Sequence, residues 1–197
     1  GGDKGLGKTI TDVLAQAGAI VYATSRDIDK GGNIISPTHD NGETKISLQL
    51  DVVNQSSVDI AVKTIIEKHG RIDILVNNAG VLGASDWAKR KEENDEDWEM
   101  NYQVNLRGLA RMTQAVAPFM KQKHYGKIVN IASNAGRAGN KDHIPSAYGA
   151  TKAAVINLTQ TNALELARYD INVNCVCPGI VWTPMLKTIG DRLGHLN

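Results

Sequence analysis

The sequence predicts an α/β protein in which a parallel β-sheet is covered by helices on both faces, giving three layers. Strand-like and helical runs alternate along the chain. The strand-like runs are rich in Ile and Val with little strict alternation, which is typical of parallel strands buried on both faces. Small, polar or turn-forming residues follow several of them, at Asp51, Asn77, Ser133 and Pro178. Ligands of such sheets bind beyond the carboxyl ends of the strands, so the sequence predicts a site along one sheet edge.

The predicted elements alternate in order along one domain, with no internal repeat and no linker. The strands are predicted at Ala19–Thr24, Lys45–Asp51, Ile72–Asn77, Lys127–Ala132 and Ile171–Cys177. The helices are predicted at Leu6–Ala17, Ser57–His69, Asp97–Gln122 and Ala147–Tyr169. The polar region Asp27–Thr44 contains glycines and a proline, so no helix is predicted there. The charged run Lys89–Asp97 is interpreted as a solvated loop leading into a helix.

Composition excludes several classes of partner. The chain has 197 residues, which fits one domain with a sizeable core. Its 22 basic and 21 acidic residues give a net charge of +1, so nothing favours binding to nucleic acid or to a membrane surface. Its longest apolar runs are too short to cross a bilayer. We therefore expect no nucleic-acid partner and no membrane partner.

The cysteine pattern indicates a reducing compartment. Cys175 and Cys177 lie in one strand-like run, and the sequence has no second pair to staple the fold. Buried, reduced strand thiols are favoured over a catalytic thiol. Reduced thiols are typical of the cytosol, so we expect a cytoplasmic protein. No signal peptide is visible, but the chain starts too late in its fold to test for one. No metal site is predicted.

The opening stretch GGDKGLGK has the features of a phosphate-binding turn. Gly1, Gly5 and Gly7, with Lys4 and Leu6 among them, lie directly before a helical pattern. Glycine lets backbone approach a ligand closely, and the N–H groups at a helix start attract an anion. By themselves these glycines are equally typical of an ordinary turn.

The stretch Tyr148 to Lys152 has the form Y-x-x-x-K. Residues i and i+4 share a helix face, so the phenol and the amine lie one turn apart. A nearby ammonium favours phenolate, so we expect the pKa of Tyr148 to be lowered toward a value useful for acid–base catalysis. Ser133 ends a strand, where its hydroxyl could donate to a substrate carbonyl oxygen. The alternative for the Tyr148 and Lys152 pair is an ordinary pair on a helix surface.

Asn105 interrupts an apolar stripe at helical spacing. The stripe consists of Trp98, Tyr102, Leu109, Met112, Val116 and Met120. A buried Asn needs hydrogen-bonding partners, because leaving it unpaired costs stability. From the pattern alone, backbone groups are the simplest partners.

Together these stretches resemble the short-chain dehydrogenase/reductase family. With a Thr placed before Gly1, the opening reads T-G-x-x-x-G-x-G, and Asn77–Gly80 matches the family's N-N-A-G turn. The segment Cys177–Pro184 is similar to the family's P-G-x-V-x-T. The matches cover almost the whole chain, to about residue 185. They imply a Rossmann-like doubly wound fold over 1–197, lacking the family's first strand and its C-terminal substrate lid.

The resemblance implies roles at the reacting end. Ser133 is the catalytic serine, Tyr148 exchanges the proton with the substrate oxygen, and Lys152 orients the cofactor ribose and tunes Tyr148. Asn105 bends its helix and holds a water beside Lys152. Because Ser133 and Tyr148 are slightly farther apart than is commonest in the family, the Asn134–Ala147 loop is expected to carry a small insertion that shapes the substrate pocket.

The strand after the first helix ends with Ser25 and Arg26, where an NAD site usually places an acid. A guanidinium matches a 2′-phosphate, and Lys4 adds a second cation. We therefore expect NADP(H), with NAD(H) as the alternative, because Asp27 weakens the argument. The other interpretation of Arg26 and Lys4 is two ordinary surface cations.

The resemblance assigns further contacts to the cofactor. Asp51 and Val52 lie near the adenine, although a turn cap is almost as good an interpretation of Asp51. The remaining residues, which border the cofactor or hold its nicotinamide end, are Asn78, Ala79, Gly80, Tyr148, Lys152, Pro178, Gly179, Val181 and Thr183. For Thr183 the alternative is a turn that starts a helix.

The implied activity is hydride transfer between NADP(H) and a small carbonyl or secondary alcohol substrate. A cofactor-binding scaffold without turnover and a sugar-nucleotide epimerase or dehydratase are the rival functions. The family also implies a homodimer or homotetramer assembled through the two long predicted helices.

Overall fold

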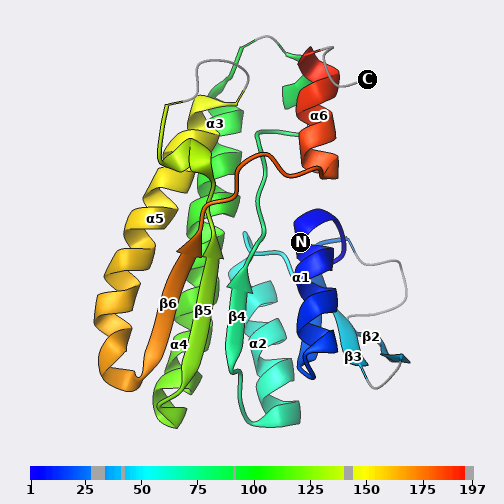
Figure 1. Ribbon diagram of the computed structural model, residues 1–197, viewed down its shortest axis with the longest axis vertical. Coiled ribbons are helices and arrows are strands. Elements are labelled where there is room, and N and C mark those ends of the chain that lie inside the picture. The colour runs from blue at the N-terminus through cyan, green and yellow to red at the C-terminus, as the bar shows by residue number, and fades with distance from the viewer. Residues whose placement is uncertain (28–33, 41–42, 91, 140–143, 194–197) are drawn as a thin grey trace.

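The computed structural model describes residues 1–27, 34–40, 43–90, 92–139 and 144–193 (Figure 1). Its main elements are α1 (Gly5–Gln16), β1 (Ile20–Ser25), β2 (Ile34–Asp40), β3 (Glu43–Gln49), α2 (Gln55–His69), β4 (Ile74–Asn77), α3 (Asp95–Asn101), the π-helical turn η2 (Tyr102–Gly108), α4 (Leu109–Lys123), β5 (Gly126–Ile131), α5 (Ser146–Leu166), β6 (Ile171–Val176) and α6 (Pro184–Leu193). Short 3-10 turns lie at Trp87–Lys89, Asn134–Gly136 and Ala167–Tyr169. The predicted α/β alternation is confirmed.

Within the described residues, the strands form two three-stranded sheets, ordered β1-β3-β2 and β4-β5-β6. β1 pairs with β3 in parallel, and β4, β5 and β6 are parallel to one another. β2 was not expected. It pairs antiparallel with β3 and arises from the Asp27–Thr44 region, of which residues 28–33 and 41–42 lie outside the described residues.

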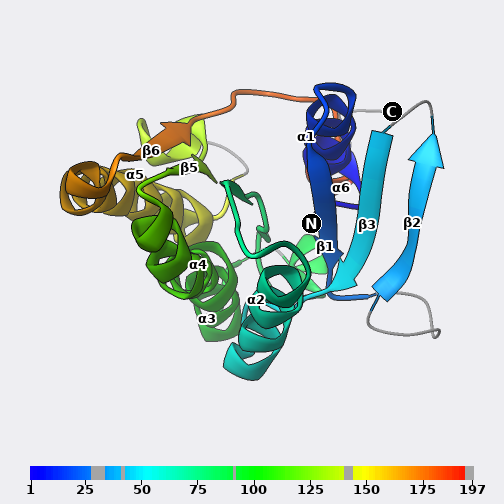
Figure 2. The ribbon, with the colours of Figure 1, turned by 90° about the horizontal axis from the view of Figure 1, so that it is seen from below.

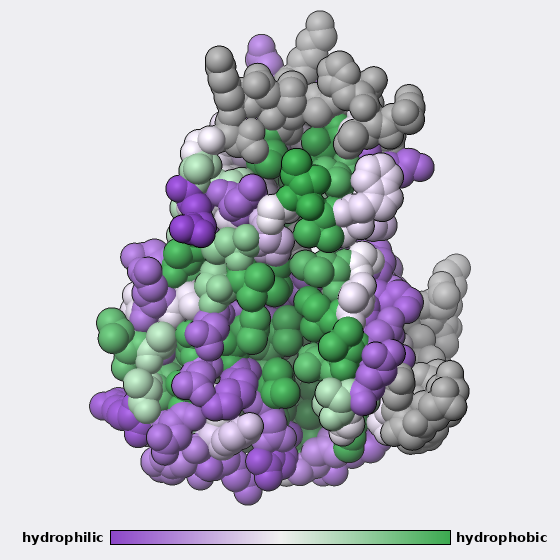
Figure 3. All heavy atoms as spheres, viewed as in Figure 1, coloured by the Kyte–Doolittle hydropathy of each residue, from purple (hydrophilic) through white to green (hydrophobic). Residues whose placement is uncertain are grey.

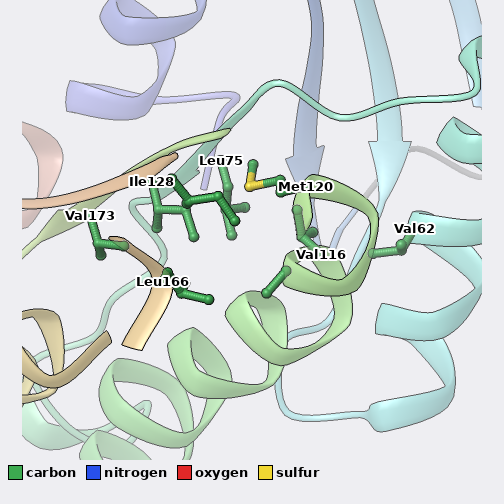
Figure 4. Close-up of a cluster of buried hydrophobic side chains, with 9 residues drawn as sticks. Val62, Leu75, Val116, Met120, Ile128, Leu166 and Val173 are labelled. Atoms are coloured by element: carbon green, nitrogen blue, oxygen red, sulfur yellow. The ribbon is translucent and has the colours of Figure 1, made fainter. Parts of the chain in front are cut away.

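Helices flank the strands in layers (Figure 2). α1 packs on β1 and β3, whereas α4 packs on β4 and β5, α5 packs on β6, and α2 packs against α4. The main core lies between β4–β6 and these helices, and Figure 4 shows its side chains pointing toward one another. Its centre is formed by Val116, Met120 and Ile128, each with 0% exposure.

Local sequence explains where several helices begin and end. The side chain of Asn54 caps α2 by accepting from the Ser57 N–H, and Gly70 ends that helix with φ of 69°. Asn94 and Asp97 form a capping box at the start of α3. A left-handed residue after a helix is most easily a glycine, because glycine has no Cβ to clash.

An apolar cavity of about 560 Å³ lies between β1 and β4, which share no hydrogen bonds among the described strands. Its walls include Ile10 and Leu14 of α1, Val21 of β1, Val76 of β4 and Val116 of α4. Figure 3 shows hydrophobic residues gathered on this central part of the face, between β4 and α1. The expected single sheet is therefore divided at this cavity.

In the part of the chain that the structure describes, each helix is either too short or too polar to cross a bilayer.

Candidate active site

The glycine turn is too close-packed to accept a side chain at Gly7. A Cβ there would lie 1.7 Å from the carbonyl oxygen of Gly1. That oxygen accepts a hydrogen bond of 2.8 Å from the Asn78 side chain. Gly5 begins α1 with φ of 53°, which favours glycine.

The start of α1 fits an anionic group. Lys4, the N-cap residue, makes no capping hydrogen bond with its side chain, and the first turn contains no acidic residue. The N–H groups and the positive end of the helix dipole therefore have no negative side chain of this turn to satisfy them. The glycine cradle and this helix start together fit the phosphates of a dinucleotide.

The residues at the end of β1 are placed as expected, but Arg26 is paired. Ser25 is buried, and its hydroxyl donates to the carbonyl oxygen of Asp27 at 3.5 Å. The Arg26 Nε atom lies 3.4 Å from Asp27 Oδ1, and the side chain is 64% exposed. A hydrogen bond and the charge of Asp27 raise the pKa of Arg26.

Asp51 acts as a turn cap. One of its carboxylate oxygens accepts from the Val53 N–H at 3.0 Å, and its own N–H donates to the Ser57 hydroxyl. Val52 packs against η2, because a Cβ on Gly108 would come within 2.6 Å of Val52 Cγ2. The alternative given for Asp51 is thus observed, and contact with an adenine stays a prediction.

The Asn77–Gly80 turn joins several parts of the site. Asn77 donates to the buried Asn130 side chain at 2.9 Å, and Asn78 holds the glycine turn. Ala79 lies against Gly1, since a Cβ on Gly1 would be 3.3 Å from the Ala79 Cα. A Cβ on Gly80 would lie 3.4 Å from Asn105 Oδ1 and 3.5 Å from Lys152 Nζ. Gly80 therefore separates two of the expected catalytic side chains.

Asn105 belongs to a buried polar ladder. Its side chain accepts from the Val81 N–H at 2.8 Å and donates to the Val81 carbonyl at 2.9 Å. Asn101, one turn earlier, donates to the Leu82 carbonyl, and Asp97 accepts from the Ala84 N–H. The expectation that backbone groups satisfy Asn105 is confirmed, and its helix is interrupted there by η2.

The predicted apolar stripe is wrong at its beginning. Trp98 and Tyr102 are 47% and 43% exposed, whereas Asp97, Asn101 and Asn105 are buried. The π-helical turn contains more residues per turn than an α-helix, so it shifts which residues face inward. Farther along, the predicted Leu109, Val116 and Met120 are buried.

The charged run is also less solvated than expected. Asp97 is 0% exposed and lies 2.8 Å from the Arg90 guanidinium. Burial works to raise the pKa of Asp97, but hydrogen bonds from Arg90 and from the backbone of Ala84 and Asn94 outweigh it and lower that pKa. The interpretation of the run as a solvated loop is therefore wrong for Arg90 and Asp97; Lys91 lies outside the described residues.

Ser133, Tyr148 and Lys152 meet near the carboxyl end of β5. Ser133 follows β5 and is buried; its oxygen accepts from the Ala135 N–H at 3.2 Å. Lys152 is 4% exposed and donates to the Ile131 carbonyl at 2.7 Å. Its Nζ lies 5.6 Å from the centre of the Tyr148 ring. The i and i+4 placement on α5 is confirmed.

The expected lowering of the Tyr148 pKa is not observed. Burial raises the pKa of Tyr148, and a hydrogen bond with Ser133 offsets only part of that rise. Burial also lowers the pKa of Lys152 to about 8, so its ammonium is itself disfavoured. The prediction considered the charge of Lys152 but not the loss of water around both groups.

The segment after β6 connects the reacting end to the glycine turn. The Pro178 carbonyl accepts from the Asn134 N–H at 2.9 Å, and a Cβ on Gly179 would lie 3.9 Å from Asn134 Nδ2. Val181 is 42% exposed. The Thr183 hydroxyl accepts from the Leu186 N–H, and Thr183 Cβ would lie 3.7 Å from a Cβ on Gly5. The alternative interpretation of Thr183 as a helix start is observed.

Sequence reasoning missed several supporting residues. Asn101 could have been found from its i, i+4 spacing to Asn105. Gly136 carried no signal, yet a Cβ there would lie 2.6 Å from the Ala153 nitrogen of α5. Part of the predicted Asn134–Ala147 insertion, residues 140–143, lies outside the described residues. Within the described ranges, no three His, Cys, Asp or Glu side chains gather as metal ligands would.

Comparison with known proteins gives concordant matches. A family model described as short chain dehydrogenase matches residues 1–194. The chain is 35% identical over 192 residues to 3-oxoacyl-[acyl-carrier-protein] reductase FabG of Thermotoga maritima, covering 98% of this chain and 76% of the relative. It is 39% identical over 194 residues to the (2S)-[(R)-hydroxy(phenyl)methyl]succinyl-CoA dehydrogenase subunit BbsD of Thauera aromatica, covering 98% and 75%. The solved structure of ElxO with NADP bound matches with a TM-score of 0.83 and 30% identity, covering 100% of this chain and 77% of that one.

Proposed function

The chain belongs to the short-chain dehydrogenase family, whose members are oxidoreductases that bind a nicotinamide cofactor, and from that premise we propose that it interconverts a secondary alcohol and a ketone, or reduces an aldehyde, with NADP(H). The observation that carries this proposal is the meeting of Ser133, Tyr148 and Lys152 at one sheet edge. The influence of the Ser133 side chain on the pKa of Tyr148 and the 5.6 Å separation of Lys152 Nζ from the centre of the phenol ring support it.

The proposed chemistry divides between cofactor and protein. When bound, the nicotinamide supplies or accepts the hydride. The Ser133 hydroxyl donates to the substrate carbonyl oxygen and stabilises the charge that develops there. Tyr148 gives that oxygen its proton; because burial raises the Tyr148 pKa, the phenol is protonated at neutral pH, as an acid must be. Because its pKa is lowered to about 8, the Lys152 amine exchanges protons near neutral pH. Asn105 lies on the other side of Gly80 from this amine.

NADP(H) is the proposed cofactor form. The exposed Arg26 guanidinium and Lys4, together with the absence of an acid from the first turn of α1, favour a 2′-phosphate. That ElxO was solved with NADP bound is consistent with this choice. Arg26→Asp is expected to lower the preference for NADPH over NADH, measured as the ratio of kcat/KM values, by roughly tenfold or more. An unchanged ratio would contradict the role of Arg26.

Assays of cofactor oxidation and reduction distinguish the proposed function from its competitors. We would follow NADPH oxidation with a panel of ketones, aldehydes and 3-oxoacyl thioesters, and NADP⁺ reduction with secondary alcohols. The proposed enzyme oxidises NADPH with at least one carbonyl compound, and NADH more slowly. A scaffold protein binds NADPH without oxidising it. Retention of tightly bound NAD through purification would favour an epimerase or dehydratase.

Assembly and location are also proposed. We infer a homodimer or homotetramer formed through α4 and α5, supported by the 82% exposure of Leu164 on α5; sedimentation velocity tests this. A cytoplasmic location is supported by two free thiols, Cys175 and Cys177.

We further propose that the complete fold is one domain with another strand in the cavity between β1 and β4, and with a substrate lid beyond α6. The strand is supported by the apolar cavity walls and by the Gly2 N–H, which already donates to the Thr24 carbonyl at the end of β1.

A further inference from the structure

α5 carries Tyr148 and Lys152, but its own sequence does not cap its start. Ser146 is its first residue, and the preceding N-cap position is Pro145, whose side chain has no hydrogen-bond acceptor. The first turn also lacks an acidic residue. The first N–H groups of a helix need acceptors from elsewhere, particularly where that end is partly buried.

Glu93, from the charged segment before α3, supplies these acceptors. Its Oε2 accepts from the Ser146 N–H at 2.9 Å, and its Oε1 accepts from the Ala147 N–H at 3.1 Å. One carboxylate thus satisfies two successive N–H groups immediately before Tyr148. A negative charge at a helix start is also favoured by the helix dipole.

The backbone around Glu93 is itself fixed. Arg90 donates to the Glu92 carbonyl at 3.2 Å and pairs with the buried Asp97. The Asn94 N–H donates to Asp97 at 3.0 Å. Hydrogen bonds on both sides of Glu93 therefore hold it to the start of α3, so its carboxylate is aimed from a rigid support.

We propose that Glu93 is a positioning residue that caps α5 from a distant segment and so fixes Tyr148 for proton transfer. This inference rests on the proposed function. Glu93 does not touch the reacting atoms; it acts through the two amides that precede Tyr148. Small displacements of an acid–base group lower turnover strongly, which makes this cap relevant to rate.

The test combines hydrogen exchange with kinetics on the full chain. Glu93→Ala is expected to speed amide exchange in residues 146–149 by roughly twofold to thirtyfold, the range that the loss of a helix cap gives. It is expected to lower kcat per NADPH-binding site by roughly tenfold or more, with KM for NADPH within about twofold of wild type. Glu93→Gln keeps one acceptor oxygen, so its exchange rate and its kcat are expected to lie between those of wild type and Glu93→Ala. Glu92→Ala, at the exposed neighbour, changes neither quantity.

A second substitution tests whether the loss of the helix cap, and not another effect of Glu93→Ala, causes these changes. Pro145→Ser in the Glu93→Ala background gives α5 a local N-cap hydroxyl, on a backbone whose φ of −54° and ψ of 140° suit that position. Recovery of exchange protection and of kcat supports the proposal. Unchanged exchange in Glu93→Ala overturns the cap, and faster exchange with unchanged kcat overturns the positioning role. If the wild-type protein oxidises no NADPH, the proposed function fails, while exchange still decides whether Glu93 caps α5.

Discussion

The amine nitrogen of Lys152 lies 5.6 Å from the centre of the Tyr148 ring, yet its hydrogen bond goes to the Ile131 carbonyl oxygen, 2.7 Å away. The side chain that acts on the Tyr148 hydroxyl is that of Ser133, which works against the rise in the pKa of Tyr148. Lys152 is therefore a neighbour of the phenol and not its direct partner.

Tyr148→Phe should remove the proton donor and leave the ring in place. We expect kcat to fall by roughly 10²-fold to 10⁴-fold, the usual contribution of a positioned acid, with little change in NADPH affinity or in unfolding temperature. Steady-state rates and NADPH fluorescence titration measure these effects. Tyr125→Phe, at a tyrosine that is 43% exposed, is the matched control. Retained turnover in Tyr148→Phe would exclude Tyr148 as the acid.

Gly136→Ala should disturb the contact between the Ser133 segment and α5. The new Cβ would lie 2.6 Å from Lys152 carbon and Ala153 nitrogen atoms, so one backbone must move. We expect a stability loss of about 1–3 kcal/mol by urea unfolding, together with a fall in kcat. A Cβ on Gly139 meets nothing within 4 Å, so Gly139→Ala is the control. Equal behaviour of the two variants would contradict the contact.

Asn105→Ala should leave the Val81 N–H and carbonyl without their side-chain partners. Both groups are partly buried, and a buried group that loses its partner costs about 1–3 kcal/mol, so we expect the unfolding free energy to fall by about 1–3 kcal/mol. Denaturant unfolding measures it. Asn157→Ala removes an exposed Asn from α5 and is expected to be close to neutral. An unchanged unfolding free energy in Asn105→Ala would mean that the buried polar ladder contributes little to stability.

Lys152→Met should change how stability depends on pH. Burial lowers the pKa of Lys152 from 10.5 to about 8, so between these values the unfolded chain binds the extra proton. The contribution of Lys152 to the unfolding free energy therefore rises with pH across this window, by an amount of order 3 kcal/mol. The unfolding free energy of wild type minus that of Lys152→Met should therefore rise between pH 8 and pH 10.5, as measured by denaturant unfolding curves. Lys63→Met, which removes an exposed amine, controls for lost positive charge, and a flat difference would contradict the lowered pKa.

An apolar strand added before Gly1 should stabilise the chain by filling the cavity between β1 and β4. We expect a six-residue Val- and Ile-rich extension to raise the unfolding temperature by several degrees, because it buries apolar surface and pairs with both strand edges. A Gly- and Ser-rich extension of equal length is the control. Equal unfolding temperatures for the two would show that the cavity does not accept a strand.

Local sequence predicted the elements well because each depends on near neighbours. The strands ending near Asp51, Asn77, Ser133 and Pro178 all occur, with ends shifted by one or two residues. The periodicity at Trp98 and Tyr102 misled because it assumed a uniform α-helix, whereas the π-helical turn changes the register. The antiparallel β2 was missed because its sequence is polar and lacks strand-like alternation.

Long-range packing set the properties that the sequence did not reveal. The pKa of Tyr148 depends on burial, which only the assembled fold determines. Glu93 meets Ser146 across a long stretch of chain, and a run of charges gives no sign that one of them faces a helix end. The sequence motifs nevertheless identified four residues that lie in the same region of the structure, namely Ser133, Tyr148, Lys152 and Asn105.

The cavity between β1 and β4 separates two groups of site residues. The glycine turn accompanies β1, whereas Tyr148 is carried by the half built on β4–β6. The link between Asn78 and Gly1 and the approach of Thr183 to Gly5 join the two. If the proposed roles of Arg26 and Tyr148 hold, substitutions on the β1 side would alter nucleotide preference and substitutions on the β4–β6 side would alter substrate chemistry, each without disturbing these two contacts.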